Sequence, residues 1–148
     1  MNFSLYSEIQ HWPGKSVGQL YEEVVEQVVN ADRLGFDAYA VLEHFFFPKF
    51  SVSANPFALW GICAARTKQI RFRTLGHVLP YHNPTILASQ IGAADILFGG
   101  RYEFGALLNK YDAQGNLRDW WTPEDAKAFE ERAQCISKQY SGYTIVDE

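Results

Sequence analysis

The sequence predicts an α/β protein built on a parallel sheet. Four short segments of strand character alternate with three longer segments of helical periodicity over the first 104 residues. The second strand segment, 38–42, is a continuous apolar run, which is typical of a strand buried on both faces. Strands that alternate with helices form right-handed crossover units around a parallel sheet. Spacing alone leaves a Rossmann-like sheet and a barrel-like sheet both open.

The first strand is expected at Phe3 to Tyr6, and the first helix from about Val17 to Leu34. Ser16 stands at the N-cap position with Gln19 three residues later, which is the pattern of a capping box. Gly35 follows where a left-handed C-cap residue is favoured. Apolar residues recur at helical spacing through this segment, at Leu20, Val24, Val25, Val28, Ala31 and Leu34. One face of the helix is therefore expected to pack on the sheet.

The later elements follow the same alternation. Asn55 and Asn83 each precede a proline, a good helix start, although an asparagine there could also serve as a ligand. Gly99 and Gly100 mark a helix end. The expected order is strand 38–42, an aromatic loop 45–50, helix 56–68, strand 70–79, helix 84–98 and strand 101–104.

The pattern changes character after Gly105. A polar turn over 112–116 is followed by Trp120 and Trp121, and Thr122 with Pro123 forms a helix start. A helix is expected from there to about residue 139. Its apolar face would use Ala126, Phe129, Ala133 and Ile136, with Glu130, Glu131, Arg132 and Lys138 mostly solvated.

Composition excludes several classes of partner. The formal net charge is −4 and the basic residues form no stripe, so neither nucleic acid nor an anionic membrane surface is an expected partner. No apolar run reaches the length of a membrane span, and no leader pattern opens the chain, so we expect a soluble cytoplasmic protein. The two cysteines, Cys63 and Cys135, lack metal-site spacing and are expected to be reduced and structural.

Several motifs over residues 1–105 resemble the opening third of luciferase-like flavin monooxygenases. They occur in the order that the family shows: LGFD at 34–37, LEHF at 42–45, NP at 55–56, RTLGHVLP at 73–80 and GGRYEFG at 99–105. The resemblance favours the barrel over the Rossmann alternative. It implies that residues 1–105 are the first half of a (β/α)8 TIM barrel with parallel strands, followed by a short helical tail at 106–148.

The same resemblance supplies candidate site residues. Functional residues of parallel barrels gather at the carboxyl ends of the strands. In the family, the Glu-His pair after the second strand lies near the flavin, which implies a proton-transfer role for His44 and a cofactor-binding role for Glu43. Thr74, Leu75 and Gly76 match the third strand, where small residues let the backbone approach the flavin ring. A β-bulge or a tight packing point is the other interpretation of Gly76.

The implied cofactor is reduced FMN or a deazaflavin, and the implied substrate is a small organic molecule. One departure from the family concerns the stretch after the fourth strand, where a glycine-rich segment with an arginine is usual. Here residues 106–110 read ALLNK. The family holds the flavin phosphate with later loops that have no counterpart in this chain, so we expect FMN binding to be weak or absent.

Residues 108–148 resemble a different family, the neprilysin-type zinc metallopeptidases. The matching motifs are YDAQGNL at 111–117, WWTPED at 120–125 and the segment from Cys135 to Tyr140. Peptidases of that class hold zinc with a His-Glu-x-x-His helix, and that motif is absent from the sequence. We therefore expect neither a zinc site nor peptidase activity.

Three interpretations of function stay open. The first is a flavin-dependent oxidoreductase in which His44 assists proton transfer. The second is a non-catalytic half-barrel or binding module, whose open sheet edges and apolar concave face would be covered by the tail or by a homodimer. The third is a chimeric chain joined near Gly105 that has no selected activity.

Overall fold

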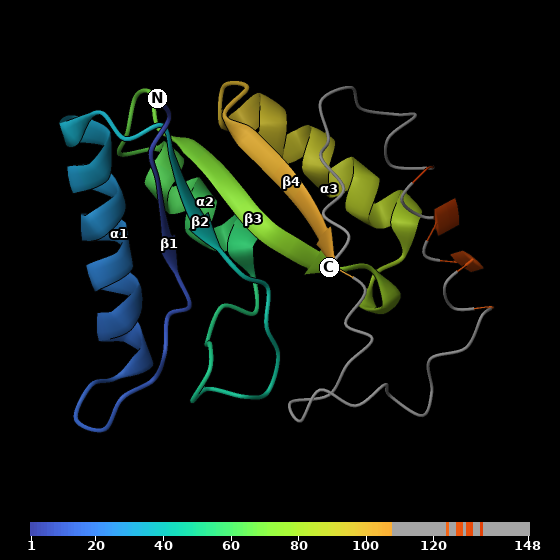
Figure 1. Ribbon diagram of the computed structural model, residues 1–148, viewed down its shortest axis with the longest axis horizontal. Helices are drawn as coiled ribbons and strands as arrows, with labels where there is room; N and C mark the ends of the chain where they lie inside the picture. Colours follow the sequence, from blue (N-terminus) through green and yellow to red (C-terminus); the bar gives the residue numbers. More distant parts are fainter. Residues whose placement is uncertain (108–123, 125–126, 129, 132–133, 135–148) are drawn as a thin grey trace.

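The computed structural model describes residues 1–107, 124, 127–128, 130–131 and 134. Strands and helices alternate along the chain, and the four strands form one parallel sheet in the order β1-β2-β3-β4 (Figure 1). The predicted α/β class and parallel pairing are confirmed. The elements are β1 Ser4–Ser7, α1 Val17–Leu34, β2 Ala38–Val41, α2 Pro56–Ala64, β3 Arg71–Val78, the 3-10 turn η1 Leu79–Tyr81, α3 Pro84–Leu97 and β4 Tyr102–Leu107.

One hydrophobic core lies between the three helices and one face of the sheet. Alternate strand residues point into it, among them Tyr39, Phe72 and Phe104. Trp60 of α2 is fully buried at its centre, with its ring 6.3 Å from that of Tyr39 and 5.3 Å from that of Phe72. Cys63 is free and buried in the same core, which agrees with its predicted structural role. Cys135 lies outside the described residues.

The helix starts are those that the sequence predicts. Ser16 and Gln19 form both hydrogen bonds of the capping box, and Gly35 closes α1 in the left-handed conformation with φ of 81°. The side chains of Asn55 and Asn83 accept hydrogen bonds from backbone N–H groups in the first turns of α2 and α3. The helix-start interpretation of both asparagines is therefore confirmed.

The predicted end of α2 at Lys68 is wrong, because the helix stops at Ala64. The backbone N–H groups of Lys68, Gln69 and Ile70 donate to the Asp32 carboxylate at 3.0, 2.9 and 2.7 Å instead of to helix carbonyls. Asp32 is buried near the end of α1, so this carboxylate joins α1 to the start of β3. The segment before β3 is consequently held by a tertiary contact that local sequence does not reveal.

Arg101 closes the same end of the sheet. Its guanidinium bonds to groups at the ends of the helices, and Asp95 near the end of α3 is exposed. The Arg101 guanidinium donates to the carbonyls of Ala64 and Phe98 and to Thr67 Oγ1, and it lies 4.8 Å from the centre of the Phe72 ring. Arg101 therefore ties the end of α2 to the end of α3.

The pairing of β3 with β4 contains a bulge between Thr74 and His77. A Cβ placed on Gly76 would lie 2.5 Å from the carbonyl carbon of Gly105, and one placed on Gly105 would lie 2.5 Å from the carbonyl oxygen of Thr74. The two glycines thus allow the strand backbones to approach closely, and the peptide bond before Gly76 is cis. The tight-packing interpretation of Gly76 is the one that the geometry supports. β4 continues beyond the predicted Phe104 to Leu107.

The sheet face opposite the core is charged at its amino-terminal half. Nε of Arg71 and Nε of Arg73 each lie 2.5 Å from a different carboxylate oxygen of Glu103. Strand register places these side chains beside Ser4, whose Oγ is 3.4 Å from an Arg73 nitrogen. The expectation of an apolar concave face is therefore wrong for this half, because two guanidinium groups share one carboxylate there.

The tail is described at six positions, 124, 127, 128, 130, 131 and 134, and all six are helical, within the predicted helical range. Glu130 and Glu131 are exposed as predicted, and Lys127 lies 3.9 Å from Glu131 one turn along the helix. The remaining predicted features of the tail, including Trp120, Trp121, Thr122 and the apolar face, lie outside the described residues. Across the positions that are described, no helix combines the length and the apolar character needed to cross a membrane.

Replacing Asp32 with alanine is expected to lower the free energy of unfolding by about 3 kcal/mol, because three backbone N–H groups, that of buried Ile70 among them, lose a charged acceptor. Urea unfolding followed by circular dichroism measures the change. Asp95→Ala is the matched control, and its exposed side chain predicts a change within about 0.5 kcal/mol. Equal unfolding midpoints for the two variants would contradict the role of Asp32.

Gly76→Ala is expected to cost about 2–3 kcal/mol of stability, because the new methyl group collides with the β4 backbone. Gly18→Ala provides a contrast within α1, where the added Cβ would meet only Ser16 Oγ at 3.8 Å. Alanine is the better helix former, so that variant is expected to be at least as stable as the wild type. Thermal unfolding of both proteins tests the pair, and a stable Gly76→Ala protein would show that β3 and β4 can separate without cost.

Candidate functional site

The carboxyl ends of the four strands surround a pocket of about 290 Å³. None of its lining residues has a charged side chain, and most of them are apolar: Tyr6, Leu42, Leu75, Gly76, Gly105, Ala106 and Leu107. Each strand or the residue after it contributes, and the two glycines leave a stretch of bare backbone in the wall. The volume is close to the lower end of the range of small-molecule sites, roughly 300–1,000 Å³. The lining suits a flat apolar ring, and it offers no cationic side chain to a phosphate.

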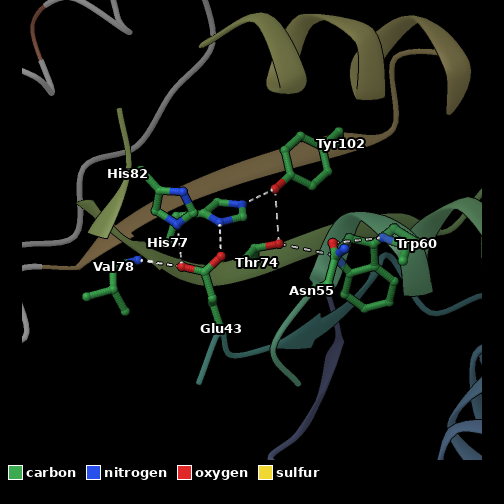
Figure 2. A network of polar contacts seen from close by, with 9 residues as sticks. Glu43, Asn55, Trp60, Thr74, His77, Val78, His82 and Tyr102 are labelled. Atoms are coloured by element: carbon green, nitrogen blue, oxygen red, sulfur yellow. Dashed lines mark hydrogen bonds and ion pairs between the residues drawn. The ribbon is translucent and has the colours of Figure 1, made fainter. Parts of the chain in front are cut away.

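A buried cluster is centred on Glu43 (Figure 2), which follows the pocket-lining Leu42 in the chain. Glu43 follows β2 with only one residue between, and its carboxylate turns toward the end of β3. Oε1 lies 2.8 Å from Nδ1 of His77, and Oε2 lies 2.7 Å from Nε2 of His82. The backbone N–H of Val78 donates to Oε2 at 2.9 Å. Both carboxylate oxygens are therefore fully engaged, although Glu43 is only 4% exposed.

The His77 ring connects this carboxylate to the core. Its Nε2 lies 2.7 Å from the Tyr102 hydroxyl, which is 3.1 Å from Thr74 Oγ1, and Nε1 of Trp60 donates to Thr74 Oγ1 at 3.2 Å (Figure 2). The imidazole is stacked between Phe57 at 4.8 Å and Phe104 at 5.5 Å. These contacts fix the orientation of a ring that has no exposed surface.

The ionised carboxylate of Glu43 determines which nitrogens of the two histidines carry protons. An ionised carboxylate only accepts, so His77 Nδ1 and His82 Nε2 both carry the proton that faces Glu43. Burial by itself would raise the pKa of Glu43, but the hydrogen bonds from His77 and His82, the charge of His77 and the Val78 N–H outweigh it and lower the pKa to about 2. Glu43 is therefore ionised at neutral pH.

His44 lies apart from this cluster. It begins the loop that leads to α2, its backbone N–H donates to the Ser53 carbonyl, and its ring contacts Phe50 at 4.8 Å. Its Nδ1 is buried and has no hydrogen-bond partner within the described residues. Burial lowers the pKa of His44, and a hydrogen bond with the Phe45 backbone opposes that effect only in part, so the neutral imidazole is favoured.

The structure distributes the predicted site residues over three places. Leu75 and Gly76 line the pocket, as a cofactor-binding role requires. Thr74 points to the helix side of the sheet and bonds Tyr102 and Trp60, and Glu43 faces the two histidines. His44 lies two residues beyond the pocket-lining Leu42 and is not itself part of the lining.

Sequence reasoning assigned no role to three members of the cluster: His77, His82 and Tyr102. His77 immediately follows a predicted site residue, but no local pattern pairs it with a glutamate 34 positions earlier. His82 precedes the Asn83-Pro84 helix start, which by itself accounts for the local sequence. Only strand pairing brings these residues to one carboxylate.

Comparison with known families gives two matches along the chain. Residues 1–107 match the family described as luciferase-like monooxygenase, and residues 101–148 match peptidase family M13. The chain is 33% identical over 99 residues to 3,6-diketocamphane 1,6-monooxygenase of Pseudomonas putida, a match that covers 67% of this chain and 26% of that protein. It is 51% identical over 81 residues to neprilysin-2 of Drosophila melanogaster, which covers 55% of this chain and 8% of that protein.

Solved structures agree with the fold. The oxygenating constituent of 3,6-diketocamphane monooxygenase from Pseudomonas putida, a type II Baeyer-Villiger monooxygenase in complex with FMN, superposes with a TM-score of 0.80 at 27% identity, over 93% of this chain and 39% of that one. An F420-dependent secondary alcohol dehydrogenase superposes with a TM-score of 0.68 at 17% identity, over 95% of this chain and 42% of that one, which shows a shared fold only. The predicted barrel-type arrangement is thereby confirmed for the described sheet. The chain spans about a quarter to a third of the length of the curated monooxygenases it matches.

Glu43→Gln is expected to make the protein less stable at neutral pH, with a penalty that disappears in acid. The folded-state pKa is lowered from 4.5 to about 2, so the ionised carboxylate contributes stability above pH 4.5 that is lost as the pH falls toward 2. The full shift corresponds to about 3 kcal/mol. Urea unfolding of both proteins across this pH range measures the difference. A gap between wild type and variant that stays constant with pH would contradict the assigned ionisation.

Proposed function

Because this chain belongs to the luciferase-like monooxygenase family, we propose that its strand-end pocket binds the ring system of a flavin and that the chain acts in flavin-dependent oxidation of a small organic substrate. The cofactor is reduced FMN or a deazaflavin. One observation carries the proposal: the pocket lies at the carboxyl ends of four parallel strands, the position where barrel enzymes bind their ligands. A bound reduced flavin supplies the electrons for such chemistry.

The pocket fits the ring better than the rest of the cofactor. Leu75 and Leu107 offer apolar surface to a planar ring, and the bare backbone at Gly76 and Gly105 allows close approach. No lining residue is charged, so the phosphate of FMN finds no ionic partner there. Phosphate contacts supply much of the anchoring of a nucleotide, and binding is therefore expected to be weak.

His44 is the proposed proton-transfer group. Its Nδ1 is buried without a partner among the residues described, and burial keeps the ring neutral, so the ring nitrogen can accept a proton and return it. Leu42 places this part of the chain next to the pocket. In this proposal Glu43 and Thr74 do not contact the flavin. Their side chains form hydrogen bonds within the protein interior and so position the strand ends that line the pocket.

Peptidase activity forms no part of the proposal. Residues 101–148 match the M13 family, but the whole sequence contains no His-Glu-x-x-His motif. The two metal-binding histidines and the general base of such an enzyme are therefore missing.

Titration of the purified chain with FMN, followed by flavin fluorescence, is expected to show weak saturable binding. Leu75→Glu places a carboxylate in the apolar pocket and is expected to weaken binding by about tenfold or more, since even 1.4 kcal/mol of lost affinity has that effect. Ile96→Glu, on the 82% exposed Ile96 of α3, is the matched control and should bind like the wild type. Equal affinities for both variants, or no saturation by a folded chain, would refute the pocket as a flavin site and favour a non-catalytic half-barrel.

Oxidation of reduced flavin in the presence of the chain separates binding from chemistry. His44→Ala is expected to retain FMN affinity and to slow the proton-dependent step by about 10²–10⁴-fold. Stopped-flow absorbance measures the rate. Wild-type and variant traces that both match a protein-free blank would overturn the catalytic part of the proposal.

A further inference from the structure

We propose that Glu43, His77 and His82 form a binding site for one divalent first-row transition-metal ion, with Zn²⁺ as the ion of choice. The site is separate from the flavin pocket and independent of the proposed function. It rests on the convergence of two imidazole nitrogens and one carboxylate at a single buried point, with an outer layer of hydrogen bonds that orients them.

The three donor groups already lie at nearly ligand-like separations. One atom from each residue can be chosen so that all three lie within 4.8 Å of one another, and the nitrogens of His77 and His82 are 2.8 and 2.7 Å from Glu43 oxygens. A tetrahedral zinc ion with bonds of about 2.0–2.1 Å holds its ligand atoms roughly 3.3 Å apart. To admit the ion, the two short carboxylate–nitrogen separations would widen by about 0.5 Å, and any separation at the 4.8 Å limit would narrow by about 1.5 Å.

His77 is held in the orientation that a ligand requires. Its ring is stacked between Phe57 and Phe104, which fixes the ring plane, and Nδ1 lies 2.8 Å from Oε1 of Glu43. On the other side of the ring, Nε2 is 2.7 Å from the Tyr102 hydroxyl. Histidine ligands of metals usually donate their second N–H to such an acceptor, and Val78 N–H supports the carboxylate in the same way.

Metal binding needs only a relocation of protons within this arrangement. A neutral His77 that coordinates through Nδ1 carries its proton on Nε2 and donates it to Tyr102, whose hydroxyl then donates to Thr74 Oγ1. Trp60 Nε1–H occupies another lone pair of the same oxygen. A neutral His82 that coordinates through Nε2 likewise carries its proton on Nδ1. No buried polar group of the Glu43-His77-Tyr102 chain loses its partner.

Charge and access favour a cation. The partners of Glu43 among the described residues are two imidazoles and a backbone N–H, with no lysine or arginine. Two imidazoles and one carboxylate form a donor set typical of zinc and its neighbours, and three protein ligands leave a fourth position open. The His82 side chain is 22% exposed, which gives an ion a route from solvent.

The test uses the tag-free full chain, freed of metal by chelation and then dialysed against Zn²⁺ or Co²⁺. The expected result is one ion per chain by metal analysis, together with the visible absorption of four- or five-coordinate Co²⁺. His82→Asn removes a ligand from a partly exposed turn without touching the buried core, and it is expected to weaken binding by at least 100-fold. Tyr102→Phe keeps all ligands but removes the outer hydrogen bond, and about 10- to 100-fold weaker binding is expected.

His11→Asn is the matched control, because His11 lies on the β1–α1 loop, with its ring near the Lys15 carbonyl and away from the cluster. It should bind one ion with wild-type affinity. Circular dichroism confirms that each variant is folded before it is scored. A folded wild-type chain that binds less than one ion, or a His82→Asn chain that binds Zn²⁺ as tightly as the His11→Asn chain, would overturn the proposal.

Discussion

The burial of one ionised carboxylate organises the carboxyl end of this sheet. Taking the Glu43 charge out of water is costly unless polar groups surround it, and the two histidines and the Val78 N–H meet that requirement. His77 in turn contacts the hydroxyl of Tyr102 on β4 through its Nε2. The carboxylate thus connects the end of β2, β3, the following turn and β4 in one polar network.

The residues of β3 contribute to the hydrophobic core on one face of the sheet and to the charged cluster and the pocket on the other face. On the core side its residues pack around Trp60, whereas on the other side Arg73 reaches Glu103 and Leu75 opens into the pocket. Gly76 has no side chain, and this allows the β4 backbone to pack closely against β3 at that residue. The pocket wall is therefore a consequence of strand packing.

The two family matches overlap on residues 101–107, which contain the whole of β4 and belong to the sheet of the first family. Strand pairing and the contacts of Tyr102 and Phe104 place this segment in the core. The fold of the described part is therefore that of the luciferase-like family. The tail match adds sequence similarity without the ligands that its own family uses for zinc.

Local sequence was sufficient for the elements and their order. The helix from Val17 to Leu34, its cap at Ser16 and the asparagine starts of α2 and α3 depend on interactions within a few residues, so their signals are readable in the chain. The early end of α2, set by Asp32, and the cluster around Glu43 depend on partners more than 30 residues away, which only folding brings together. The sequence therefore determined the α/β class and the strand that carries the pocket. Tertiary structure decided which polar side chains surround Glu43, because a buried charge is stabilised by groups that are close in space, wherever they lie in the sequence.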